Sequence, residues 1–181
     1  METNSKQDAN LISNCSQVIL LRHAKSTSNT QRQDLRLDPN FDESELISVK
    51  VDKSFRDAEL SESGFKQCEK VQDFFNDQKV HTVLISPLRR ALQSAYHIFK
   101  VHPNFNEIRF VLVPKMREII NTSQSFPANI NTSIQEFSKL FPNFDTSELD
   151  LYPDPLNYYV DDLDDELKEH IKSNLEYKED D

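Results

Sequence analysis

The stretch VILLRHAKSTSN, from Val18 to Asn29, decides how this sequence is interpreted. Its four apolar residues run directly into Arg22 and His23. A short continuous apolar run is typical of a strand that is buried on both faces, and therefore central in a mainly parallel sheet. We predict such a strand over residues 16–22. A core strand gains nothing from ending on a cation and an imidazole, so Arg22 and His23 indicate a functional site.

Two more apolar runs follow, each separated from the previous run by enough residues for a connecting helix. HTVLIS, residues 81–86, and IRFVLVP, residues 108–114, predict the second and third buried strands. Helical patterns separate the strands. We therefore predict an α/β fold, a three-layer αβα sandwich with a mainly parallel central sheet.

Two helices are predicted between these strands. Residues 61–78 follow a period of about 3.6 residues, with Ser61 placed to cap the start. The predicted apolar side of this helix consists of Phe65, Cys68, Val71, Phe74 and Phe75. Pro87 is expected to open the second helix, residues 87–100, at the position where a missing N–H costs nothing.

The remaining sequence sets the expected domain organisation. Residues 1–15 are predicted to be a flexible polar leader, residues 16–176 a single domain, and residues 177–181 an acidic tail. After Glu118 the sequence is rich in turn residues, with one predicted helix near residues 134–140. The apolar stripe of a last predicted helix consists of Val160, Leu163, Leu167, Ile171 and Leu175.

Composition and charge exclude several classes of protein. Of the 31 acidic and 21 basic residues, 13 and 3 respectively lie from Glu148 to Asp181, so the rest of the chain is neutral. An acidic end of this kind argues against nucleic acid as a partner. No apolar run approaches the roughly 20 residues of a membrane helix. Cys15 and Cys68 are isolated and no secretory signal is present, so we expect a cytoplasmic protein.

The sequence favours a phosphate site that is built from side chains. Gly64 is the only glycine, which excludes a glycine-rich phosphate loop. Ligand sites of open α/β sheets lie beyond the carboxyl ends of the strands. Three such ends carry polar groups: Arg22 and His23, then Ser86, Arg89 and Arg90, then Arg117 and Glu118. An imidazole nucleophile, guanidinium forks and a carboxylic acid together suit phosphoryl transfer.

Four ordered motifs extend this interpretation. LLRHAKSTSN resembles the RHG-type signature of the histidine phosphatase superfamily, the group that includes phosphoglycerate mutases, with Ala24 in place of its glycine. DAELSESGFKQ, from Asp57, resembles the D-x-x-L-[ST]-x-x-G-x-x-Q segment of that family. SPLRRALQSA, from Ser86, resembles S-x-L-x-R-A-x-x-T-A, and PKMREI resembles the strand end that carries the acid.

The resemblance implies a role for each matching residue. His23 is expected to become phosphohistidine, with Arg22 and Arg90 as the phosphoryl clamp and Glu118 as the general acid. Asn29 and Ser26 are expected to contact phosphate, and we place Arg89 with the substrate-binding residues. The expected partner is a phosphorylated small molecule or a phosphoprotein. No metal and no organic cofactor is expected, because arginines replace the cation. Hydrolysis is favoured over mutase chemistry.

The family pattern also requires a second histidine on a later strand, and the sequence does not supply it. The only histidine after Glu118 is His170, which we interpret as a solvent-facing helix residue. A truncated product, a fragment and a diverged family member all fit this pattern. The alternative to an enzyme is therefore a pseudophosphatase or truncated domain that binds phosphorylated ligands or a protein partner.

Overall fold

The computed structural model describes residues 17–118, 123–125 and 130–151. Its sheet has three parallel strands in the order β1-β2-β3, with bounds Thr82–Ile85, Arg109–Leu112 and Phe144–Asp145. Val83 pairs with Phe110, and Ile85 pairs with Leu112. These four side chains share one face because alternate residues of a strand point the same way. The predicted α/β class with a parallel sheet is confirmed.

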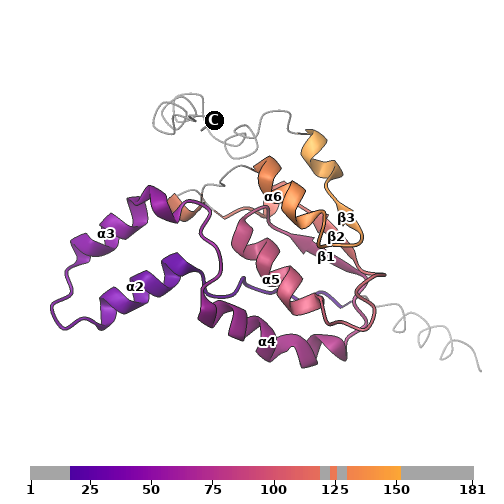
Figure 1. The fold of residues 1–181 in the computed structure, drawn as a ribbon, viewed down its shortest axis with the longest axis horizontal. Coiled ribbons are helices and arrows are strands. Elements are labelled where there is room, and N and C mark those ends of the chain that lie inside the picture. Colours follow the sequence, from indigo (N-terminus) through magenta and orange to yellow (C-terminus); the bar gives the residue numbers. More distant parts are fainter. Residues whose placement is uncertain (1–16, 119–122, 126–129, 152–181) are drawn as a thin grey trace, which may run out of the picture.

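Helices pack against that face of the sheet (Figure 1). Helix α4, Glu62–Asn76, lies beside helix α5, Arg89–Phe99, and helix α6, Ile130–Phe137, follows later in the chain. Helices α2, Thr27–Leu37, and α3, Glu43–Val51, form a hairpin that projects from the body. Short 3-10 turns complete the described elements: η1 Lys53–Phe55, η2 Pro114–Met116, η3 Ser123–Ser125 and η4 Ser147–Leu151.

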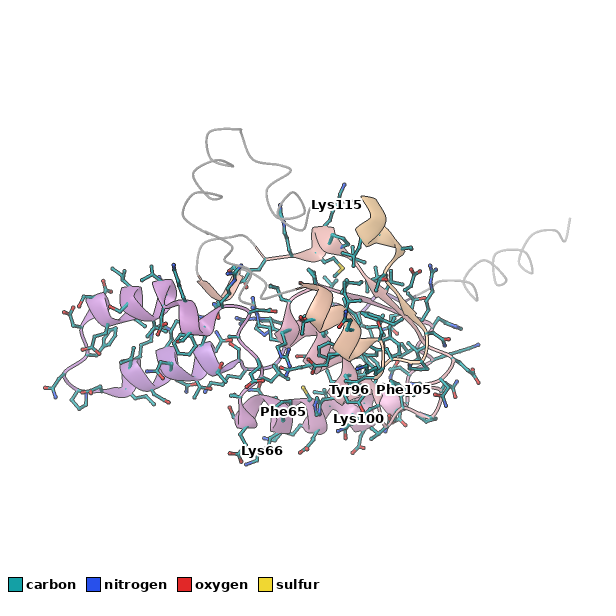
Figure 2. All side chains as sticks on the ribbon, turned by 45° about the horizontal axis from the view of Figure 1, so that its top comes forward. Phe65, Lys66, Tyr96, Lys100, Phe105 and Lys115 are labelled. Carbon is teal, nitrogen blue, oxygen red and sulfur yellow. The ribbon has the colours of Figure 1, made fainter. Side chains whose placement is uncertain are left out.

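Aromatic side chains dominate the core between α5 and the sheet. Phe110 of β2 is fully buried, and its ring centroid lies 4.5 Å from that of Phe141. Phe99 of α5 approaches Phe110 from the helix side at 6.2 Å. Tyr96 and Phe105 lie side by side at one end of this cluster, 6.4 Å apart (Figure 2). These contacts fix α5 against β2, and α5 carries Arg90.

The predicted helices that lie within the described residues are present, with corrections. The helix predicted near residues 134–140 is α6, which begins and ends earlier, at Ile130 and Phe137. Ser61 caps α4 by accepting a hydrogen bond from the Gly64 N–H, as predicted. Phe74 is 53% exposed, so its place on the buried side was wrong. Helix α5 begins at Arg89 and not at Pro87. The reason is that the Arg89 N–H donates to the Asp57 carboxylate at 2.8 Å, which satisfies the first turn from outside the helix.

The predicted first strand is absent from the described sheet. Val18 is 81% exposed and Leu20 is 90% exposed, and no strand is assigned to this run. A strand needs a hydrogen-bonded neighbour, and none of the described residues pairs with the backbone of Val18–Leu21. Four apolar residues in a row indicated burial, but burial depends on a partner that the local pattern does not reveal.

Several predictions lie outside the described residues. They concern the leader over residues 1–15 with Cys15, the helix over residues 160–177 with His170, and the acidic tail. Cys68 lies on the buried side of α4 as predicted, and burial raises the pKa of its thiol. Within the described part of the chain, none of the helices has the length and apolar character to cross a membrane.

At Gly64, helix α4 comes close to the backbone near the predicted nucleophile. A Cβ at Gly64 would lie 2.1 Å from the carbonyl oxygen of Lys25. That oxygen also accepts hydrogen bonds from the Ser61 N–H at 2.9 Å and from the Ser61 hydroxyl at 3.0 Å. The start of α4 therefore packs directly against the backbone of Lys25, two residues after His23. Only glycine at position 64 fits this short separation between the two backbones.

Replacing Gly64 with alanine should lower the free energy of unfolding by about 1–3 kcal/mol, because backbone must move to relieve the contact. In a helix without such a contact, the same change raises stability by about 1 kcal/mol. The sign of the change is therefore diagnostic. Denaturant-induced unfolding followed by circular dichroism measures it, with Lys70→Ala on the exposed side of α4 as the control. Equal or higher stability of Gly64→Ala would contradict the contact.

Candidate active site

The segment that carries His23 is tied to helix α5 by one hydroxyl group. The Ala24 N–H donates to Ser94 Oγ at 2.9 Å, and this hydroxyl donates to the Arg90 carbonyl at 2.7 Å. Ser94 lies four residues after Arg90, the spacing at which a helical serine returns a hydrogen bond to the preceding turn. Ser94 was not predicted as a site residue, although it lies within the motif that begins at Ser86. It sets the distance between His23 and Arg90.

Arg90 is the centre of the site. Its side chain is 1% exposed, and each guanidinium nitrogen has a different partner. Nε donates to His23 Nε2 at 3.1 Å, and Nη1 donates to the Gln124 carbonyl at 2.7 Å. Nη2 forms an ion pair with Glu118. One buried cation therefore contacts both the predicted nucleophile and the predicted acid.

The hydrogen bonds of His23 fix its tautomer. Nδ1 lies 2.8 Å from the Ala24 carbonyl oxygen and donates to it, which leaves Nε2 as the acceptor for Arg90. Burial is the largest cause that lowers the pKa of His23, and the charges of Arg90 and Arg22 lower it further. The Ala24 hydrogen bond and Glu118 oppose this shift. The net result is a neutral imidazole whose Nε2 lone pair faces the guanidinium group.

Glu118 reaches the site from the loop after η2. Its side chain is 46% exposed, so one part of the carboxylate contacts Arg90 and another contacts solvent. A partly exposed acid beside a buried cation is suited to proton exchange with water. Glu118 was predicted to lie near His23 after the third predicted strand, and the structure places it there, in the loop that follows β2 and η2.

Asn29 and Ser26 form the capping box of helix α2. The Asn29 N–H donates to Ser26 Oγ at 3.2 Å, and Asn29 Oδ1 accepts from that hydroxyl at 2.8 Å. Asn29 Oδ1 is thereby occupied, while no described residue accepts from Asn29 Nδ2. The hydrogen bonds to Oδ1 thus orient the Asn29 amide, and within the described ranges its Nδ2 is available to a ligand. Ser26 is fully buried, so the structure places it as the support of Asn29.

The predicted arginines differ in their surroundings. Arg22 is exposed, and its charge acts on His23. Arg89 forms ion pairs with Glu136 at 2.8 Å and with Glu59 at 4.0 Å. The structure therefore gives Arg89 carboxylate partners on the neighbouring elements, and its contact with phosphate stays a prediction. Ser86 lies after β1, and its Oγ is buried without a hydrogen-bond partner among the described residues.

Asp57 is a residue that sequence reasoning placed in a motif without a role. It is 3% exposed and has a φ of 47°, in the left-handed region. Aspartate tolerates this region better than most residues. Its carboxylate accepts from the Arg89 N–H and so positions the first turn of α5. Since Arg90 is the next residue, Asp57 acts as a positioning residue for the guanidinium group.

Replacing Asp57 with alanine should lower the free energy of unfolding by about 1–2 kcal/mol through loss of the cap. It should also lower kcat/KM for a phosphomonoester about tenfold or more, because small displacements of a positioning group are costly. Asp57→Asn keeps an acceptor oxygen and the tolerance of positive φ, so it should retain most activity. Asp57→Gly accepts the backbone conformation but lacks the cap. Equal activity of the asparagine and alanine variants would contradict the positioning role.

The other described histidines have structural surroundings. The ring centroid of His97 lies 4.6 Å from that of Phe65. His102 Nε2 lies 3.2 Å from the Gln78 carbonyl oxygen, and Nδ1 accepts from the Asn104 N–H at 3.1 Å. Over the described ranges, no three His, Cys, Asp or Glu side chains lie in a group that could hold a metal ion.

These features define an α/β protein with a histidine, arginine and carboxylate site. The family model of the histidine phosphatase superfamily (branch 1) matches residues 50–143, just over half of the chain. The chain therefore belongs to the histidine phosphatase superfamily, which confirms the resemblance. The matched range contains Arg90 and Glu118 and begins after His23. No curated protein and no solved structure matches the chain.

Proposed function

We propose that this protein is a phosphomonoester phosphatase, or a phosphomutase, that acts through a phosphohistidine on His23. The observation that carries the proposal is the position of Arg90, whose guanidinium group contacts His23 Nε2 and Glu118 together. Membership of the histidine phosphatase superfamily supports phosphoryl transfer as the general chemistry.

In the first step, the lone pair of His23 Nε2 attacks the phosphorus atom. The bond from phosphorus to the alcohol oxygen breaks, and its electron pair stays on that oxygen. Glu118 relays a proton from solvent, through the exposed part of its carboxyl group, to the departing alcohol. Arg90 and Arg22 offset the negative charge on the non-bridging oxygens, and Asn29 Nδ2 donates to one of them. The products are phosphohistidine and the free alcohol.

In the second step, water attacks the same phosphorus atom and transfers a proton to the Glu118 carboxylate. The bond from phosphorus to Nε2 breaks, which returns His23 to its neutral form and releases inorganic phosphate. A second alcohol in place of water gives mutase chemistry. The exposed part of Glu118 makes water the more accessible acceptor, which favours hydrolysis.

The alternative is a protein that binds phosphorylated ligands without turnover. One observation favours it: among the described residues, no second histidine contacts His23, since His97 packs on Phe65 and His102 bonds to Gln78. Binding through Arg90, Arg22 and Asn29 does not require a second imidazole. Release of phosphate from His23 is the step that such a protein lacks.

The test uses p-nitrophenyl phosphate with the full chain. We expect release of nitrophenolate and inorganic phosphate, and a phosphoenzyme in rapidly quenched samples that is labile in acid and stable in base. Peptide mapping should locate this phosphate at His23. Neither turnover nor a phosphoenzyme would overturn the proposal. A phosphoenzyme at His23 without turnover would support attack by the nucleophile and assign the defect to hydrolysis.

A further inference from the structure

Gln124 contacts Arg90 and has a side-chain oxygen that the proposed mechanism does not use. It is the middle residue of η3, and its carbonyl accepts from Arg90 Nη1 at 2.7 Å. The residue is 7% exposed. Its Oε1 is buried, and no group of the described residues donates a hydrogen bond to it. A buried amide oxygen without a donor is costly, so this position is suited to a small molecule that can donate.

Gln124 and Glu118 are held on neighbouring nitrogens of one guanidinium group. Nη1 and Nη2 of Arg90 are bonded to the same carbon, and they contact the Gln124 carbonyl and the Glu118 carboxylate respectively. The guanidinium group is planar and rigid, and the Arg90 side chain is 1% exposed, so it fixes its two partners beside each other. The side chain of Gln124 therefore begins next to the carboxylate that the proposed mechanism uses for proton transfer.

Water is the donor that matches these two oxygens. Gln124 Oε1 can accept one hydrogen bond, and the ionised Glu118 carboxylate can accept another. A water molecule has two O–H groups and can donate to both oxygens at once. The side chain of Glu118 is 46% exposed, so water reaches it directly from solvent. An alcohol has only one hydroxyl hydrogen. It needs this hydrogen for proton transfer to Glu118, and it leaves Gln124 Oε1 without a donor.

We propose that Gln124 Oε1 orients the water that attacks phosphohistidine and thereby favours water over an alcohol as the acceptor of the phosphoryl group. The inference rests on the proposed function and deepens it, since it names a residue that selects hydrolysis over mutase chemistry. In the second step, the water oxygen bonds to phosphorus, and the electron pair of the phosphorus–Nε2 bond returns to His23. One hydrogen of the water transfers to Glu118. The other donates to Gln124 Oε1 and stays on the product phosphate.

The test measures how the phosphoryl group is divided between water and methanol. The full chain is incubated with p-nitrophenyl phosphate in buffer that contains methanol, and phosphorus NMR quantifies inorganic phosphate and methyl phosphate. After correction for the concentrations of the two acceptors, the wild type should favour water. Gln124→Met keeps the length of the side chain and removes the acceptor oxygen. It should lower the ratio of inorganic phosphate to methyl phosphate by about tenfold, the effect expected for one lost hydrogen bond.

Asn76→Leu is the matched control. Asn76 is the last residue of α4, and its Oδ1 is also buried without a hydrogen-bond partner in the described part of the chain. The product ratio of this variant should stay within about twofold of the wild type. Gln124→Glu keeps an acceptor oxygen at the same chain length, so it should restore a part of the preference for water. An unchanged ratio in Gln124→Met, or an equal fall in Asn76→Leu, would overturn the proposal.

Calorimetric binding of orthovanadate distinguishes failure of this inference from failure of the proposed function. On a histidine, vanadate adopts a trigonal bipyramid with an oxygen opposite Nε2, where the attacking water lies, and inorganic phosphate has no such oxygen. If the wild type does not turn over p-nitrophenyl phosphate, the proposed catalysis fails. Vanadate binding about tenfold weaker in Gln124→Met, with unchanged phosphate binding, would then still support the inference. Equal vanadate binding to both proteins, or none to either, would overturn it.

Discussion

Replacing His23 with alanine should lower the turnover of p-nitrophenyl phosphate by about 10⁴-fold or more, the scale seen when a nucleophile is removed. The geometry gives the reason. Nδ1 carries the proton that is donated to the Ala24 carbonyl at 2.8 Å, so the ring lone pair lies on Nε2, where it accepts from Arg90. Among the described histidines, His23 alone contacts Arg90, so no other imidazole can take its place. The labelled phosphoenzyme should disappear in the same variant.

His81→Ala is the matched control for this change. His81 is exposed and lies directly before β1, and its carbonyl group, which the substitution retains, accepts from the Arg109 N–H at 3.0 Å. We expect its turnover to lie within about twofold of the wild type, as for most exposed substitutions. Residual turnover of His23→Ala above one tenth of the wild-type rate would contradict the covalent mechanism.

The surroundings of His23 also set the pH dependence. Burial, Arg90 and Arg22 lower its pKa from 6.5, so the imidazole stays neutral at a lower pH than free histidine does. The nucleophile is active when neutral, so the acidic limb of kcat/KM that reports protonation of His23 should lie below pH 6.5. A profile of kcat/KM against pH measures this limb. An acidic limb of kcat/KM with its midpoint above pH 6.5 would contradict the lowered pKa of His23.

Hydrophobic patterns in the sequence correctly predicted the elements whose apolar face packs against another described element. Helix α4 has a 3.6-residue period and a serine cap, and it forms as predicted. The run Val18–Leu21 is apolar throughout but has no backbone partner among the described residues, and no strand is assigned to it. Periodicity identifies the side chains that can be buried, and tertiary contacts decide whether they are.

Site residues that belong to motifs were predicted from the sequence. Roles that depend on a contact between residues far apart in the sequence were missed. Arg90 and Glu118 were found because each follows a strand of the parallel sheet. Asp57 contacts Arg89 across 32 residues of sequence, and no local pattern reports such a pairing.

Replacing Arg90 should be the second most damaging change to the site. Arg90→Met removes all three donor contacts of a side chain that is 1% exposed. We expect kcat/KM for p-nitrophenyl phosphate to fall about 10³-fold, because loss of one charge-stabilising donor alone costs about 10²–10³. The free energy of unfolding should fall by about 1–3 kcal/mol, since the buried Gln124 carbonyl loses its partner. The exposed half of the Glu118 carboxylate limits this penalty.

Arg90→Lys separates charge from geometry at the same position. Lysine keeps the positive charge, but its single ammonium group cannot hold His23, Gln124 and Glu118 in the planar arrangement of a guanidinium group. We therefore expect stability close to that of the wild type and a loss of about 100-fold in kcat/KM. Arg109→Met, which breaks an exposed ion pair with Asp145 at the far end of β2, should change both quantities little. If Arg90→Lys retained wild-type kcat/KM, charge alone would suffice, and the three-way contact of Arg90 would have no part in catalysis.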